Sequence, residues 1–182
     1  MPAVAVLVVG CSGGEAGHAF LAPEGFARSG ISVAPGETAV VGLGRLRLAD
    51  PDTTATLTSL DVQGEQVAAT AGRVLGVKVY RITDSGGIGA ITAADLAGVD
   101  GNGGWQLTSP DGAVVSAEQP LGVAVVVQGD SVGSWSSDSL VVEYVMDGRE
   151  QRQRIAIGAG VCVVTAADED CDPSRAGSDS TP

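Results

Sequence analysis

The sequence is poor in the residue types that catalytic and metal sites use. Its 182 residues include one histidine, 3 cysteines and 2 methionines. The histidine, His18, precedes every strand-like segment. A Ser–His–Asp or Cys–His arrangement needs a histidine fixed within the fold, and zinc or copper carriers need clusters of His, Cys or Met. The chain also has neither a P-loop nor a dinucleotide-binding glycine pattern. We therefore expect a protein that is not an enzyme and holds no metal or cofactor.

Positive charge is also scarce. Lys and Arg together number 10 against 22 Asp and Glu, which gives a formal net charge of −12. A protein that binds nucleic acid needs a basic face for the phosphates, and anionic lipid headgroups attract basic segments. The composition therefore predicts no nucleic-acid partner and no electrostatic docking on a lipid surface.

Aromatic residues make up only 3% of the chain, so the core must consist mainly of Val, Leu, Ile and Ala. β-Branched side chains suit a pleated sheet, and the 27 glycines suit a fold with many turns. The composition thus favours an all-β protein over a helical one.

Short apolar or alternating runs, most of them separated by turn residues, follow one another along the middle of the chain. This spacing is typical of a β-sandwich or a barrel. We expect strands at 38–48, 53–62, 73–82, 113–116, 120–128, 138–146 and 149–157. A short strand at Trp105–Thr108 is expected to pair with 113–116 across the Ser-Pro-Asp-Gly turn.

The ends of the chain and one internal stretch lack this pattern. Residues 12–36 are rich in Gly, Ser, Ala and Pro and read as a flexible tether, whereas residues 166–182 read as an acidic, disordered tail. The sandwich is therefore assigned to 37–165. Inside it, the long stretch 83–104 is either a functional loop or a crossover between sheets, and Thr92–Asp95 predicts a capped short helix through Ala97.

The N-terminus reads "VVGC" followed by "SGGEAG" and resembles a bacterial lipobox, in which the cysteine receives a diacylglycerol. Residues 1–11 would then be the remnant of a signal peptide, and Cys11 the lipid anchor. A signal peptide begins with positive charge, yet no Lys or Arg precedes Arg28, so we expect the true start to lie upstream. A secreted or single-span protein, and a cytosolic one with a chance cysteine, are the alternatives.

The other two cysteines, Cys162 and Cys171, follow the last strand-like run. In an oxidising compartment they would close a short loop as a disulfide. Two unpaired thiols are the alternative.

Trp135 stands in the Gly/Ser-rich stretch "GDSVGSWSSDS", which reads as a loop. An aromatic side chain on a loop is a candidate contact residue for a partner. The alternative is that the ring folds back and covers one end of the sandwich.

The dipeptide Asp147–Gly148 between two strand-like runs predicts a two-residue type I′ hairpin. Such a turn fixes the register, with Leu140, Val142, Tyr144 and Met146 facing the core. The expected pairs are Met146 with Arg149, Tyr144 with Gln151, Val142 with Gln153, Leu140 with Ile155, and Glu143 with Arg152.

From about Thr54 to Cys162 the chain resembles small exported actinobacterial lipoproteins that carry a single immunoglobulin-like β-sandwich. The resemblance rests on "TLTSLDVQGEQV", "PLGVAVVVQ", "LVVEYVMDGREQRQRIAI" and "VCV". It implies an antiparallel immunoglobulin-like sandwich of about seven strands and assigns no activity.

Together these features indicate a non-enzymatic, lipid-anchored binding or accessory module at the bacterial cell envelope. It would sit outside the cytoplasm on the outer face of the cell membrane, with an envelope protein or glycan as partner. A structural spacer of the envelope and a carbohydrate-active enzyme using two carboxylates are the alternatives.

Overall fold

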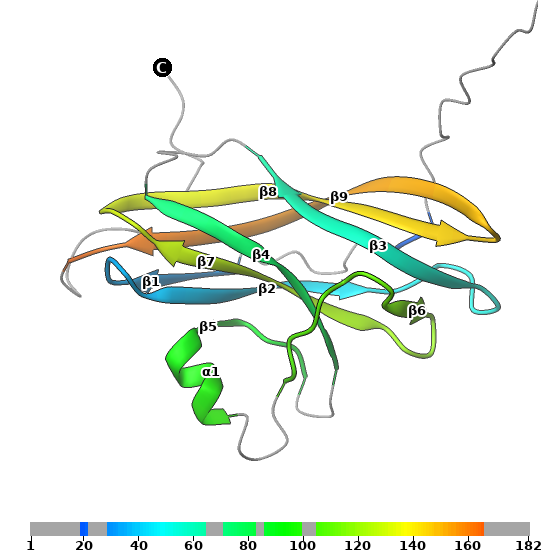
Figure 1. Cartoon of the computed structure of the whole chain (residues 1–182), viewed down its shortest axis with the longest axis horizontal. Helices are drawn as coiled ribbons and strands as arrows, with labels where there is room; N and C mark the ends of the chain where they lie inside the picture. Colours follow the sequence, from blue (N-terminus) through cyan, green and yellow to red (C-terminus); the bar gives the residue numbers. More distant parts are fainter. Residues whose placement is uncertain (1–18, 22–28, 65–70, 83–85, 100–104, 166–182) are drawn as a thin grey trace, which may run out of the picture.

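The described part of the chain is an all-β structure of two packed sheets with one short helix (Figure 1). The computed structural model describes residues 19–21, 29–64, 71–82, 86–99 and 105–165. The strands are β1 (Ser29–Val33), β2 (Thr38–Leu46), β3 (Thr54–Gln63), β4 (Gly72–Arg81), β5 (Ala90–Thr92), β6 (Val114–Ser116), β7 (Leu121–Gly129), β8 (Gly133–Met146) and β9 (Arg149–Val163), and the helix is α1 (Ala93–Val99).

One sheet has five strands in the order β1-β9-β8-β3-β6, and the other has four in the order β4-β7-β2-β5. All described strand pairs are antiparallel except β1 with β9, which is parallel. The inward-facing side chains of both sheets form the main core, which is mostly Val and Leu with a few aromatic rings. The sandwich expected from the spacing of the apolar runs is therefore present.

All seven main strand segments expected from the sequence are strands, although their ends differ. The short strand expected at Trp105–Thr108 is a correction: Thr108 forms an isolated bridge with Val79 of β4 and does not pair with residues 113–116.

The short helix expected after Thr92 is confirmed, since the Asp95 N–H donates to Thr92 Oγ1 and the Thr92 hydroxyl donates to the Asp95 carboxylate. Two strands, β1 and β5, have too few apolar residues to be recognised alone.

The tether expected over 12–36 is wrong for its described residues. Phe20 is only 3% exposed and forms a bridge with Leu48, and β1 adds a parallel strand beside the end of β9. A Gly/Ser/Ala-rich composition reads as a linker because no local pattern shows that β1 pairs with β9, where Ser29 lies opposite Ala159.

The hairpin at Asp147–Gly148 is confirmed. Both residues have positive φ, 53° and 71°, as a type I′ turn requires. All five expected cross-strand pairs occur, and Tyr144 is buried while Glu143 is partly exposed. A short-range turn signal was sufficient to fix the register of seven residues on each side of it, from Leu140 to Met146 and from Arg149 to Ile155.

Trp135 requires a correction. It lies within β8, not in a loop, and its side chain is 1% exposed in the main core. Strand β8 reaches back to Gly133 because a bulge between Ser137 and Ser139 lets it continue pairing with the end of β9. A ring buried in this way offers no surface to a partner.

Candidate binding surfaces

The outer face of the five-stranded sheet is an open polar surface built on β3, β8 and β9. Side chains alternate between the two faces of a strand, so the residues between the core positions point outward. Across the strands, Ser59 pairs with Glu143 and Glu143 with Arg152 in one row. In the next row Asp61 pairs with Val141, and Val141 with Arg154.

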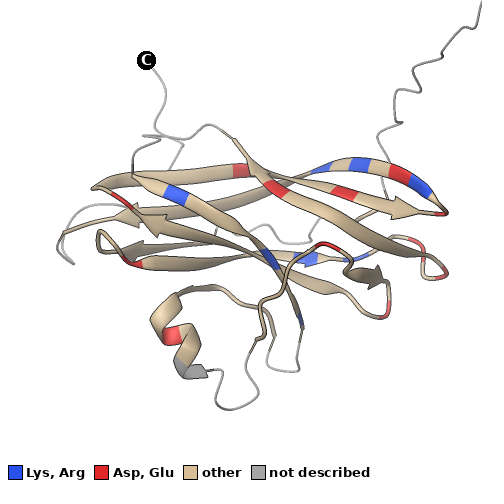
Figure 2. Cartoon of the chain, viewed as in Figure 1, with Lys and Arg blue, Asp and Glu red and all other residues tan. Residues whose placement is uncertain are grey.

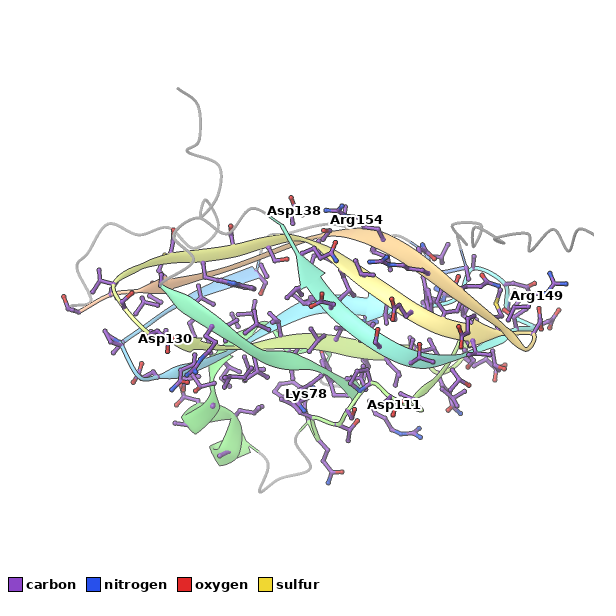
Figure 3. All side chains as sticks on the ribbon, turned by 45° about the horizontal axis from the view of Figure 1, so that its top comes forward. Lys78, Asp111, Asp130, Asp138, Arg149 and Arg154 are labelled. Carbon is purple, nitrogen blue, oxygen red and sulfur yellow. The ribbon has the colours of Figure 1, made fainter. Side chains whose placement is uncertain are left out.

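Direct contacts connect the charged groups on this face. The Ser59 hydroxyl donates to Glu143 Oε2 at 2.7 Å, and Arg152 Nε lies 3.8 Å from Glu143 Oε1. At the bulge of β8, Asp138 Oδ1 lies 3.6 Å from the Arg154 guanidinium (Figure 3). These side chains are 47–63% exposed, so the pairs stabilise the fold little and their charges remain accessible.

The sequence predicted one of these two ion pairs. The pair between Glu143 and Arg152 follows from the hairpin register. The pair between Asp138 and Arg154 depends on the bulge between Ser137 and Ser139, which shifts Asp138 out of simple alternation. Within the stretch "SSDS", no local signal separates a bulged strand from a loop.

The outer face of the four-stranded sheet is covered over much of its area. The chain between β4 and β6 adds β5 to the edge of this sheet beside β2, and α1 and the segments around Ile88 and Leu107 fold back over the outer face (Figure 1). A second apolar cluster fills the interface, with Val40, Tyr80, Ile88, Leu96 and Ala124 buried in it. Part of the long stretch 83–104 is thus a packed cover over the sheet, although residues 83–85 and 100–104 lie outside the described residues.

Two glycines make this cover possible. At Gly42 a Cβ would overlap the carbonyl oxygen of Ile88, and at Gly122 it would overlap the Tyr80 ring. The absence of side chains lets the covering chain approach the sheet closely enough for the Gly42 N–H to donate to the Gly89 carbonyl at 2.6 Å.

Tyr80 is the polar centre of the covered interface. Its hydroxyl oxygen accepts the Ile88 N–H at 2.8 Å. Burial raises the pKa of the Tyr80 phenol above 10.0, while the Ile88 N–H and the positive charge of Arg45 act in the opposite direction. A neutral, hydrogen-bonded phenol inside an apolar cluster has a structural role.

The N-terminal segment closes one end of the sandwich. The Phe20 ring meets the Tyr144 ring edge-on, with centroids 4.9 Å apart. The Tyr144 hydroxyl donates to Gln151 Oε1 at 2.9 Å, and burial raises the pKa of the Tyr144 phenol, with a backbone hydrogen bond at Ala19 opposing it. Gln153 holds the Phe20 backbone from β9. The partners of the two inward-facing glutamines on β9 are therefore an aromatic hydroxyl and the N-terminal backbone.

The predicted lipid anchor, Cys11, and the predicted disulfide partner, Cys171, both lie outside the described residues, as does the tail 166–182. Cys162 lies in β9, fully buried, and is disulfide-bonded. The pairing of Cys162 with Cys171 stays a prediction, because the cysteine bonded to Cys162 is not among the described residues.

Within the described ranges, no group of three or more His, Cys, Asp and Glu side chains could hold a metal ion. The same ranges contain no helix long and apolar enough to cross a membrane. No family model matches the chain, and the comparison with curated proteins finds no match.

Proposed function

We propose that this protein is a non-enzymatic, lipid-anchored binding module at the outer face of a bacterial cell membrane. In this proposal the fold is an immunoglobulin-like sandwich, and the partner is an envelope protein that contacts the outer face of β3, β8 and β9. The fold, the surface and the anchor have separate support.

The strand order supports the immunoglobulin-like assignment. In that fold one sheet contains strands C, F and G, and the other contains A, B, E and D. The order β3-β8-β9 matches C-F-G, and the order β2-β7-β4 matches B-E-D. Strand β5 occupies the edge beside β2 where strand A lies in that fold, and β6 is an addition between the equivalents of D and E.

The difference between the two outer faces carries the functional proposal. The helix α1 and the segments around Ile88 and Leu107 pack on the outer face of one sheet, whereas exposed, cross-paired charges stand on the other. A flat face with alternating charges in fixed register suits recognition of a protein surface with the complementary pattern. Of the two sheets, the five-stranded one therefore presents the more accessible face.

The anchor proposal rests on the lipobox-like sequence that ends at Cys11. Ala19 and Phe20 are held at the hairpin end of the sandwich, eight residues after Cys11. Eight extended residues span at most about 29 Å. A lipid on Cys11 would therefore keep this end close to the bilayer and leave the sheet faces beside it accessible.

Site-specific photo-crosslinking in cells that export the protein tests the binding surface. A photoreactive residue replaces Asp61 on the open face, and a matched probe replaces Glu118, an exposed residue in the turn before β7. We expect a discrete adduct with one protein from position 61 and none from position 118. Equal labelling from both positions would instead support a spacer role.

A further inference from the structure

Strand β3 has a free edge over its second half. On one side β3 pairs with β8 along most of its length, whereas on the other side β6 pairs only with Thr54–Thr56. Two hydrogen bonds between Leu57 and the segment before β6 extend this cover by one residue. Beyond the bulge that follows Leu57, no described strand lies on that side of β3. We call Ser59–Gln63 the open edge of β3.

The hairpin register shows which backbone groups of the open edge point away from β8. In a two-residue hairpin the residues beside the turn exchange hydrogen bonds, and such pairs then alternate along the two strands. Val142 and Leu140 therefore bond to β9 and not to β3. They lie opposite Leu60 and Val62, whose N–H and C=O groups consequently point outward from the sheet edge. No described residue bonds to these backbone groups.

The inward-facing side chains of β3 also indicate that a neighbouring strand is missing. Beside β6, Ala55 and Leu57 are 1% and 0% exposed. Along the open edge the exposed fraction rises to 8% for Leu60, and Val62 is only partly buried although it packs against the main core. Apolar side chains placed beside Val62 would remove this surface from water, which favours association.

Strand β4 also lies at the edge of its sheet, but its edge is less suited to another strand. Thr108 already exchanges two hydrogen bonds with Val79, and a bulge between Val74 and Gly76 interrupts the register. Bulges and covered segments protect an edge strand from pairing. The open edge of β3, in contrast, pairs with β8 without interruption from Ser59 to Gln63. Of these two edges it is therefore the better template for an added strand.

The charge beside the open edge indicates the chemistry of such a strand. Strand β3 carries one acidic residue, Asp61, and no basic residue (Figure 2). Asp61 is exposed and makes no ion pair or side-chain hydrogen bond within the described ranges, and Arg154 in the same row is paired with Asp138. An added antiparallel strand places a residue opposite Asp61 in a non-hydrogen-bonded pair, in which the side chains lie close together. A Lys or Arg at that position forms a cross-strand ion pair.

We propose that the partner of this protein adds an extended segment to the open edge of β3 as a further antiparallel strand. The segment carries a Lys or Arg opposite Asp61 and apolar residues opposite Leu60 and Val62, on the side that faces the core. Backbone hydrogen bonds supply affinity in this mode of docking, and the alternating side chains supply specificity. This inference rests on the proposed function, since it states how the same partner docks beside the outer face of β3, β8 and β9.

Photo-crosslinking in cells that export the protein tests this mode of docking. The photoreactive residue replaces Thr58, an exposed residue beside the open edge, so that Asp61 stays in place. Val62→Pro removes the outward N–H and leaves the hydrogen bonds between β3 and β8 intact, because that N–H does not bond to β8. We expect the adduct yield of Val62→Pro to fall about fivefold or more, whereas Val62→Ala, which keeps the N–H, should stay within about twofold of the wild type.

Two charge variants test the ion pair and do not depend on how the strand tolerates proline. Asp61→Lys places like charges opposite each other and should lower the adduct yield about fivefold or more. Glu118→Lys makes the same change in net charge at an exposed turn position and should stay within about twofold of the wild type. Thermal unfolding checks that each variant is folded.

The outcomes separate this inference from the proposed function. If folded Val62→Pro keeps the wild-type yield, or if position 61 gives an adduct and position 58 gives none, the added strand is overturned while the proposed function stands. If Val62→Pro does not fold, the yield of Asp61→Lys decides, and an unchanged yield overturns the inference. A loss in Val62→Pro with no loss in Asp61→Lys excludes the basic residue opposite Asp61. Absence of an adduct from both positions contradicts the proposed function and this inference together.

Discussion

Gln153 and Phe20 are joined by two hydrogen bonds between the Gln153 side chain and the Phe20 backbone. The Phe20 N–H donates to Gln153 Oε1 at 2.9 Å, and Gln153 Nε2 donates to the Phe20 carbonyl at 2.9 Å. The Gln153 residue is only 7% exposed, although a glutamine on an inward-facing strand position is unfavourable without partners. The Gln153 side-chain amide accepts from the Phe20 N–H and donates to the Phe20 carbonyl, as the backbone of a neighbouring strand would. It thereby fixes the N-terminal segment to β9.

Replacing Gln153 with Leu keeps most of the side-chain volume but leaves the Phe20 N–H and carbonyl without their partners. We expect the free energy of unfolding to fall by about 1–3 kcal/mol, because buried backbone groups lose their hydrogen bonds. Chemical denaturation measures this change. The control Gln119→Leu, at an exposed position, should stay within about 0.5 kcal/mol of the wild type. Equal stability of the two variants would show that the Phe20 contact contributes nothing.

The close approach of the covering chain to the four-stranded sheet gives a second prediction. Gly42→Ala places a methyl group against the Ile88 carbonyl oxygen and should destabilise the protein by about 1–3 kcal/mol. The neighbouring Gly89 has nothing within 4 Å of an added Cβ, so Gly89→Ala should leave the stability unchanged or raise it by up to about 1 kcal/mol. Equal effects of the two variants in denaturant unfolding would contradict this packing.

The two buried tyrosines predict a loss of stability at high pH. Burial raises the pKa of both Tyr80 and Tyr144 above 10.0 in the folded state, so folding favours the neutral phenol. The stabilisation is complete below pH 10 and is lost as the pH rises through the raised pKa values. Unfolding measured between pH 8 and pH 12 should show this decline, with a shallower slope in Tyr80→Phe/Tyr144→Phe. An unchanged slope would mean that other groups cause the decline.

Membrane attachment depends on Cys11 if the lipobox interpretation holds. Cys11→Ala should release the exported protein from the membrane fraction, and an inhibitor of lipoprotein signal peptidase should block processing of the wild type. Fractionation followed by immunodetection measures both effects. A Cys11→Ala protein that stays with the membrane would remove the lipid anchor from the account.

Local signals predicted some parts of this fold, while other parts depend on pairing between distant residues. Asp147–Gly148 determined the register from Leu140 to Ile155 because the turn itself sets which residues face each other. Trp135 lies in a strand only because Ala159, Gly160 and Val161 pair alongside it, and composition alone gives that stretch the character of a loop. Phe20 is buried because Gln153, Leu48 and Tyr144 converge on it from three other elements.

The candidate surfaces likewise contain some features that local sequence predicts and others that depend on pairing between distant residues. The Glu143–Arg152 pair on the open face follows from the hairpin register, whereas the Asp138–Arg154 pair depends on the bulge in β8. All charged residues on the strands of the four-stranded sheet are basic, and no local pattern in the sequence predicts this separation. A net charge of −12 describes the whole chain and says nothing about how the sheets separate the charges.

The most direct test of the proposed binding face exchanges the two charges of its central ion pair. Glu143→Arg/Arg152→Glu keeps an acid opposite a base and the net charge unchanged, but reverses the pattern that a partner meets. We predict that the unfolding free energy stays within about 1 kcal/mol of the wild type, because the pair is exposed. We also predict that the adduct formed from a photoreactive probe at position 61 is lost, because like charges then face each other across the interface. An adduct of unchanged yield in the folded variant would contradict recognition through this face.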